Sequence, residues 1–132
     1  MKSKIQKIIP DTNFLIYLAR FKLFDEFYAL GYKIIVPRIV DYELEKMSKN
    51  QETKQEDKQA ALLAQQVVKR WVELKKAEYV DVQGDYADDI ILKLALKSKC
   101  FVATMDQELQ KKLKAQGTRV IGIRQEKILE EI

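Results

Sequence analysis

The sequence predicts an α/β fold in which a mostly parallel sheet is covered by helices on both faces. Two kinds of segment, which alternate along the chain, support this prediction. Short, β-branched apolar segments alternate along the chain with longer segments whose apolar residues recur every three or four positions. Strands that alternate with helices are typical of parallel sheets, because parallel neighbours need a long crossover connection. The 132 residues fit one domain and are too few for two, so we expect a single domain over residues 1–132.

Five segments are expected to be strands, since each is short, apolar and rich in β-branched residues. They are Lys4–Ile9, Lys33–Val36, Tyr79–Val82, Phe101–Thr104 and Arg119–Ile123. Pro10 and Pro37 follow the first two segments and are expected to end them.

Helices are expected between the strands, each with an apolar stripe. The first stripe begins at Phe14. The other five cover Leu23–Leu30 (before Gly31), Ile39–Met47, Leu63–Leu74, Ile91–Ala95 and Leu109–Leu113 (before Gly117). In the long fourth stripe we expect Leu63, Val67, Trp71 and Leu74 to share the buried face, with a dimer face as the alternative for Trp71. The segment Ser48–Lys58 has no apolar residue and is expected to be a solvated loop or a frayed helix start.

Composition excludes several classes of chemistry. The chain has no histidine and a single cysteine, Cys100, which we expect to be a small buried hydrophobe. Ser-His-Asp and Cys-His nucleophiles, intrachain disulfides and thiolate clusters for zinc are therefore ruled out. The net charge of +4 is a mild bias towards polyanions. No apolar run is long enough to span a bilayer and the N-terminus does not resemble a signal peptide, so we expect a cytoplasmic protein without a membrane partner.

Acidic residues follow the expected strands at the edge of the sheet where ligands bind in such folds. Asp11 comes directly after the first strand (KIIPD), and Asp106 follows the fourth (FVATMD). Each has a structural alternative, because acids also cap helices and complement the helix dipole. Thr12 or Asn13 is available to cap the first helix instead, which would leave Asp11 facing a site.

Two further positions carry acids in comparable surroundings. Asp88 and Asp89 open the helix that begins ADDIILKLALK, where the helix dipole alone explains at least one of them. Glu43 borders the apolar stripe of its helix, so it is either an edge residue or a ligand aimed at a pocket. Carboxylates gathered in one place repel one another, and a divalent cation relieves that repulsion. Oxygen ligands without His or Cys favour Mg²⁺ or Mn²⁺ over zinc.

With these residues in view, the sequence resembles the PIN-domain nucleases. The blocks that resemble the family are IIPDTNFLI, PRIVDYELEKM, YADDIILKLALKSKCFVATMDQELQKKL and RVIGI, which together cover nearly the whole chain. The third block is most similar to the branch that processes small-subunit ribosomal RNA in eukaryotes and archaea, with the VapC toxin ribonucleases as a more distant match. The resemblance implies a three-layer α/β/α domain with a mostly parallel five-stranded central sheet, an Mg²⁺ or Mn²⁺ site, and hydrolysis of RNA.

The resemblance also implies a set of catalytic and metal-binding residues. The family's acids fall on Asp11, Glu43, Asp88 and Asp106. Asp89 is the alternative to Asp88, and Glu108 stands where a further, variable acid of the family is more often Asp. Polar positions that flank the metal site match Thr12, Asn13 and Thr104. Either one or two metal ions are compatible with this set.

Binding of RNA to such an acidic pocket requires metal and basic residues around its rim. The candidates are Arg38, Lys111, Lys112, Lys114 and Arg124, each of which is also explained as a solvated surface residue. Tyr42 and Tyr86 are candidates for stacking on bases, and packing is the alternative for both.

Three other functions share features with this sequence. A phospho-acceptor receiver domain would need an acceptor Asp at the end of a central strand. No central strand of this sequence ends in Asp, so this function is rejected. A catalytically idle PIN module that binds RNA or protein remains open, although all the matched acids are present. Among active enzymes, we expect a role in ribosomal RNA processing with a ribosome-assembly partner, and a VapC-type toxin paired with an antitoxin is the alternative.

Overall fold

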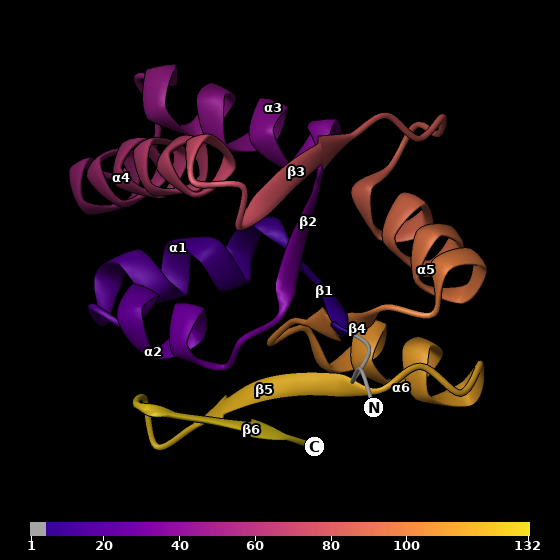
Figure 1. Ribbon diagram of the computed structural model, residues 1–132. Coiled ribbons are helices and arrows are strands. Elements are labelled where there is room, and N and C mark those ends of the chain that lie inside the picture. The colour runs from indigo at the N-terminus through magenta and orange to yellow at the C-terminus, as the bar shows by residue number, and fades with distance from the viewer. Residues whose placement is uncertain (1–4) are drawn as a thin grey trace.

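Six strands form one sheet in the order β3-β2-β1-β4-β5-β6, as the computed structural model of residues 5–132 shows (Figure 1). The first five strands run parallel and β6 is antiparallel to β5. Their bounds are β1 Lys7–Pro10, β2 Lys33–Pro37, β3 Ala77–Val80, β4 Phe101–Ala103, β5 Val120–Arg124 and β6 Ile128–Glu131.

Helices cover both faces of the sheet (Figure 1). The helices α1 to α4 lie on one face, and α5 and α6 lie on the other. Their bounds are α1 Thr12–Arg20, α2 Phe24–Ala29, α3 Arg38–Lys49, α4 Gln55–Glu73, α5 Ala87–Ser98 and α6 Gln107–Ala115. This arrangement confirms the three-layer α/β/α architecture.

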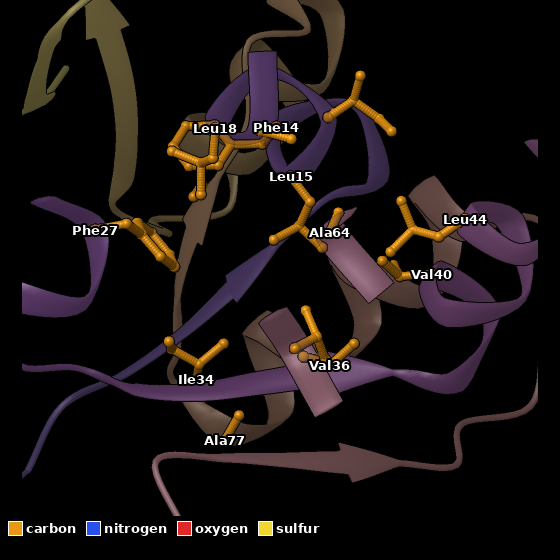
Figure 2. Packing of buried hydrophobic residues seen from close by; sticks show 14 of the residues in the cluster. Phe14, Leu15, Leu18, Phe27, Ile34, Val36, Val40, Leu44, Ala64 and Ala77 are labelled. Atoms are coloured by element: carbon orange, nitrogen blue, oxygen red, sulfur yellow. The ribbon is translucent and has the colours of Figure 1, made fainter. Parts of the chain in front are cut away.

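The alternation of side chains along the strands divides the core between the two faces. Ile8 and Ile34 point towards α1 to α4, whereas their chain neighbours Ile9 and Ile35 point towards α5 and α6. All four side chains are buried. Figure 2 shows the larger cluster, in which residues of α1, α2, α3 and α4 pack over β2 and β3. Parallel strands buried on both faces must be apolar throughout, which explains the continuous KIIP and KIIV runs.

Most predicted strands were confirmed with small shifts. The first begins at Lys7 within the described residues, and Lys4 lies outside them. The third was predicted two residues too late, because Lys75 takes a left-handed conformation (φ 61°) and turns the chain directly into the sheet at Ala77. The strand β6 was not predicted. It is a half-exposed edge strand held by β5 and by the ion pair between Arg119 and Glu131, so it has no continuous apolar signal.

The predicted buried face of α4 was wrong by part of a turn. Trp71 is 5% exposed, but Leu63 and Leu74 are 43% and 50% exposed. The buried stripe consists instead of Ala60, Ala61, Ala64, Val68 and Trp71. Small side chains are needed there because α4 packs closely against α1 and α3, so the leucines are displaced outwards.

Trp71 belongs to the core rather than to a dimer face. Its ring packs against Phe24, Phe27 and Tyr28 of α2, at centroid distances of 5.7, 6.0 and 6.3 Å. Cys100 is also buried, as expected. Of the predicted polar segment Ser48–Lys58, only Asn50–Lys54 lies outside helices, since α3 extends to Lys49 and α4 starts at Gln55. Among residues 5–132, no helix is both long and apolar enough to cross a membrane.

Candidate functional site

The direction in which the chain builds the sheet changes between β1 and β4. From β1 the chain adds β2 and β3 on one side, then returns to place β4 on the other side of β1. The last residues of the two strands, Pro10 and Ala103, are paired. Loops that leave a parallel sheet at such a point diverge and leave a crevice between them. Asp11 and Thr104 are the first residues beyond the two strand ends.

Asp11 both caps a helix and faces this crevice. Its Oδ1 accepts a hydrogen bond of 2.7 Å from the backbone N–H of Phe14, which makes it the N-cap of α1. Its Oδ2 accepts a hydrogen bond from the hydroxyl of Thr104. The carboxyl group is thus held on both oxygens, and the residue is only 7% exposed. Of the two alternatives left open by the sequence, Asp11 itself caps the helix, and neither Thr12 nor Asn13 is needed for this because one carboxylate performs both tasks.

Thr104 connects the two strand ends through three polar contacts. Besides bonding to Asp11, its hydroxyl oxygen accepts from the backbone N–H of Asp106 at 3.1 Å. Its carbonyl oxygen accepts from the side-chain amide of Gln110 at 2.8 Å. Asp106 in turn caps α6, with its Oδ1 accepting from the N–H of Leu109 at 3.0 Å. The position of Asp106 relative to Asp11 is therefore determined through Thr104.

Glu43 and Asp88 come from the two helices that flank the crevice. Glu43 lies on α3, and its Oε1 accepts a hydrogen bond of 2.5 Å from the hydroxyl of Thr12. Asp88 lies in the first turn of α5. The helices α3 and α5 lie on opposite faces of the sheet, so the two acids approach the crevice from opposite sides.

The four acids surround one pocket of about 130 Å³. Its lining consists of Asp11, Thr12, Asn13, Glu43, Ala87, Asp88 and Asp106. These residues belong to four helices and the loops before them, although 95 positions separate the first from the last. The structure thus brings together the acids that the sequence suggested, and the lining is polar apart from Ala87.

Burial and mutual repulsion make the pocket unfavourable for negative charge. Burial raises the pKa of Asp11 to about 6, and the charges of Asp88 and Asp106 add to the increase, against the hydrogen bonds from Thr104 and Phe14. Burial also raises the pKa of Asp88, with Asp106 as the next cause, while Lys112 acts in the opposite direction. A site that accumulates carboxylates at such a cost is typical of functional sites rather than of structural ones.

The donor set fits a hard divalent cation in its chemistry. Every polar side chain that lines the pocket has an oxygen atom that can bind a metal. Among them, the amide of Asn13 also carries a nitrogen. A cation would relieve the repulsion that raises the pKa of Asp11 and Asp88. Within residues 5–132, however, no three Asp, Glu or Cys side chains are gathered closely enough to form a ready coordination sphere. Binding a metal would thus require the carboxylates to close inwards.

The remaining candidate residues lie outside the pocket. Asp89 and Glu108 are exposed and contribute nothing to its lining. Arg38 pairs with Asp81 at 3.1 Å and Arg124 with Glu130 at 2.8 Å, so both cations are already engaged on the surface. Lys111, Lys112 and Lys114 are exposed on α6, and of these Lys112 influences Asp88. Tyr42 and Tyr86 are 58% and 71% exposed.

Sequence reasoning did not single out Gln110. Its side-chain amide holds the carbonyl of Thr104, one turn into the helix that Asp106 caps. Gln110 is four positions after the capping residue Asp106 and therefore lies on the same face of the helix. This spacing is the one local signal in the sequence that could have indicated its role.

Comparison with known proteins agrees with this geometry. Residues 8–126 match the family model described as PIN like domain. Ribonuclease VapC4 of Methanocaldococcus jannaschii is 35% identical over 130 residues, which cover 94% of this chain and 95% of the relative. This similarity favours the VapC proteins over the ribosomal RNA-processing branch that the sequence alone ranked first. Fold, site geometry and sequence similarity together show that this chain belongs to the PIN-like domain family.

Proposed function

We propose that this protein is a metal-dependent endoribonuclease of the VapC toxin type. The observation that carries the proposal is the convergence of Asp11, Glu43, Asp88 and Asp106 on one pocket at the switch point of the sheet. Similarity to a ribonuclease over nearly the full chain supports RNA as the substrate.

The metal would be Mg²⁺ or Mn²⁺ held by Asp11 and Asp106, with Asp88 and Glu43 completing the acidic set. When bound, such an ion activates water and neutralises charge on the phosphoryl oxygens during hydrolysis. The chain's own residues supply the positioning. Thr104 orients the carboxylate of Asp11, and Thr12 orients that of Glu43.

The surrounding residues control charge and access. Because the pKa of Asp11 is about 6, this side chain is mostly ionised at neutral pH and becomes protonated in mild acid. Lys112, whose charge lowers the pKa of Asp88, would be a basic residue near the pocket that contacts a phosphate of the substrate. Arg38 and Arg124 would first have to leave Asp81 and Glu130, which makes them weaker candidates for RNA contacts.

The relative's name favours a toxin over a processing enzyme. We therefore propose an antitoxin protein as the partner, in place of the ribosome-assembly partner expected from the sequence. A role in ribosomal RNA processing and a homodimer have no comparable support. Growth arrest on expression of the chain, absent for Asp106→Asn, is expected for a toxin, and a small gene directly upstream is expected to encode the antitoxin.

The activity is tested by incubating purified protein with single-stranded and structured RNAs in Mg²⁺, Mn²⁺ or EDTA. Cleavage is expected only with metal, and Asp106→Asn is expected to lower it by about two orders of magnitude or more. Asn is also a good N-cap, so this variant keeps α6 capped and folded. Asp25→Asn, an exposed acid at the start of α2, is the matched control.

Two results would count against the proposal. Cleavage that persists in EDTA, or that survives both Asp11→Asn and Asp106→Asn, would exclude the metal mechanism. Inactivity on every RNA with either metal would favour the idle binding module instead.

A further inference from the structure

A second hollow adjoins the acidic pocket on the side of α3. It has a volume of about 260 Å³ and is lined by Thr12, Asn13, Glu43, Lys46 and Met47. Thr12, Asn13 and Glu43 also line the acidic pocket, so the two hollows are adjacent and share these residues as a common wall. A polymer whose reacting group occupies the first hollow can therefore place a neighbouring group at the second.

The helical spacing of residues on α3 forms one wall of this hollow. Glu43, Lys46 and Met47 stand three and four positions apart and therefore share one face of the helix. That face lies opposite the start of α1, where Thr12 bonds to Glu43. Met47 is half-buried against the larger core cluster, so the floor of the hollow is anchored.

The lining differs in character from that of the acidic pocket. Met47 offers a polarizable, apolar surface of the kind that packs well on flat rings. Lys46 is exposed and supplies a positive charge, and its Nζ lies 5.5 Å from the ring centre of Tyr42. Asn13 is exposed and presents an amide that can both donate and accept hydrogen bonds. An apolar floor with a cation and an amide at its rim suits a flat heterocycle that carries polar edges and an adjacent phosphate.

We propose that the hollow formed by Asn13, Lys46 and Met47 binds a nucleobase of single-stranded RNA next to the phosphate held at the acidic pocket. The inference rests on the proposed function for its substrate class. The base would stack on Met47 and meet the amide of Asn13 at its edge, while Lys46 faces the neighbouring phosphate. The occupant must be unpaired, because a base within a duplex is stacked on both faces.

Binding is tested separately from cleavage. The Asp106→Asn protein with Mn²⁺ is titrated with fluorescently labelled single-stranded RNA oligonucleotides, either complete or with one base removed at successive positions. Removal of the base that occupies the hollow is expected to weaken binding by about tenfold, a typical loss for one stacked base. In the Met47→Ala background the complete and the abasic oligonucleotide are expected to bind with similar affinity, whereas Lys46→Ala, which removes the phosphate contact, is expected to weaken the binding of both.

Lys49→Ala is the matched control, since Lys49 lies on the same helix, is paired with Glu45 and does not line the hollow. Lys46 is exposed, so its substitution leaves folding unchanged, and the unfolding temperature of Met47→Ala shows whether that variant keeps its core. In the active background, Lys46→Ala and Met47→Ala are expected to raise KM and alter the choice of cleavage site.

The outcomes separate this inference from the proposed function. If the wild-type protein cuts no RNA but Met47→Ala loses the base-dependent binding and Lys46→Ala weakens the binding of both oligonucleotides, the proposed function fails and the subsite holds. If the protein cuts RNA and these variants bind and cut as the wild type does, the subsite is wrong. Unchanged RNA binding together with loss of binding to a protein partner would likewise overturn it and assign the hollow to that partner.

Discussion

The hydroxyl of Thr104 donates a hydrogen bond to Oδ2 of Asp11, although 93 positions separate the two residues in the chain. The contact joins the carboxyl end of β4 to the start of α1. Because the same hydroxyl oxygen accepts from the N–H of Asp106, one buried side chain sets the spacing of two acids of the site.

Replacing Thr104 by Val is expected to disturb both acids while keeping the shape of the side chain. Oδ2 of Asp11 would lose its hydrogen bond inside the protein, at a cost of about 1–3 kcal/mol in the free energy of unfolding. RNA cleavage should fall by at least tenfold, since the carboxylate is no longer oriented. Denaturant unfolding and cleavage rates measure the two effects, with Thr53→Val in the loop before α4 as the control. Unchanged values for both would refute the positioning role.

Metal-free protein is expected to lose stability as the pH rises from about 4 to 6. The folded state raises the pKa of Asp11 to about 6 from 3.8, so in this interval it binds more protons than the unfolded chain. The stabilisation is fully present below pH 3.8 and is lost once the pH exceeds 6. The change in the free energy of unfolding over this pH interval is expected to be up to about 3 kcal/mol smaller in Asp11→Asn. Unfolding in EDTA across the pH range measures it, and parallel curves for the two proteins would contradict the assignment.

Addition of Mn²⁺ should stabilise the protein more at pH 7 than at pH 5. Protons and metal compete for Asp11, whose pKa of about 6 lies between the two conditions. A ligand that binds only the folded state at a hundred times its dissociation constant adds about 2.7 kcal/mol. The shift in unfolding temperature measures this effect, and it should disappear in Asp11→Asn. An equal shift in that variant would place the metal elsewhere.

Asp88→Asn is expected to impair cleavage strongly, and Asp89→Asn only weakly. Both residues lie in the first turn of α5, but only Asp88 lines the acidic pocket. The two substitutions change the same charge one position apart and are therefore matched controls for each other. Cleavage rates in saturating Mn²⁺ should differ by at least about tenfold. The reverse order of activities would assign the third acid to Asp89.

Trp71→Ala is expected to destabilise the protein by about 3–5 kcal/mol, the usual cost of removing a buried aromatic ring. The ring contacts Phe24 and Phe27 and is 5% exposed. Leu63→Ala on the same helix is the control, because Leu63 is 43% exposed and its loss should cost far less. Denaturant unfolding measures both losses of stability. Similar losses for the two variants would indicate that Leu63 is buried, as the sequence predicted.

Local properties of the chain account for what could be predicted. The strands β1, β2 and β4 are short runs dominated by apolar residues, and the acids after the first and fourth strands lie at strand ends in any parallel sheet. Asp11 and Asp106 were therefore placed on the correct edge of the sheet without knowledge of the strand order. The phase of α4 was missed, because alanine gives a weak apolar signal and the larger leucines dominated the periodicity. Strand β6 was missed because its residues are half-exposed.

The sequence by itself determined the alternation of strands and helices, the absence of histidine chemistry and the identity of the acids at the strand ends, since each depends on neighbouring residues. The tertiary structure alone decided that β4 lies beside β1 and that Thr104 reaches Asp11. It also brought Asp88, which the family resemblance already favoured over Asp89, into one pocket with Glu43. These relationships join residues far apart in the chain, and they arise only when the sheet order and the packing of helices on both faces bring those residues together.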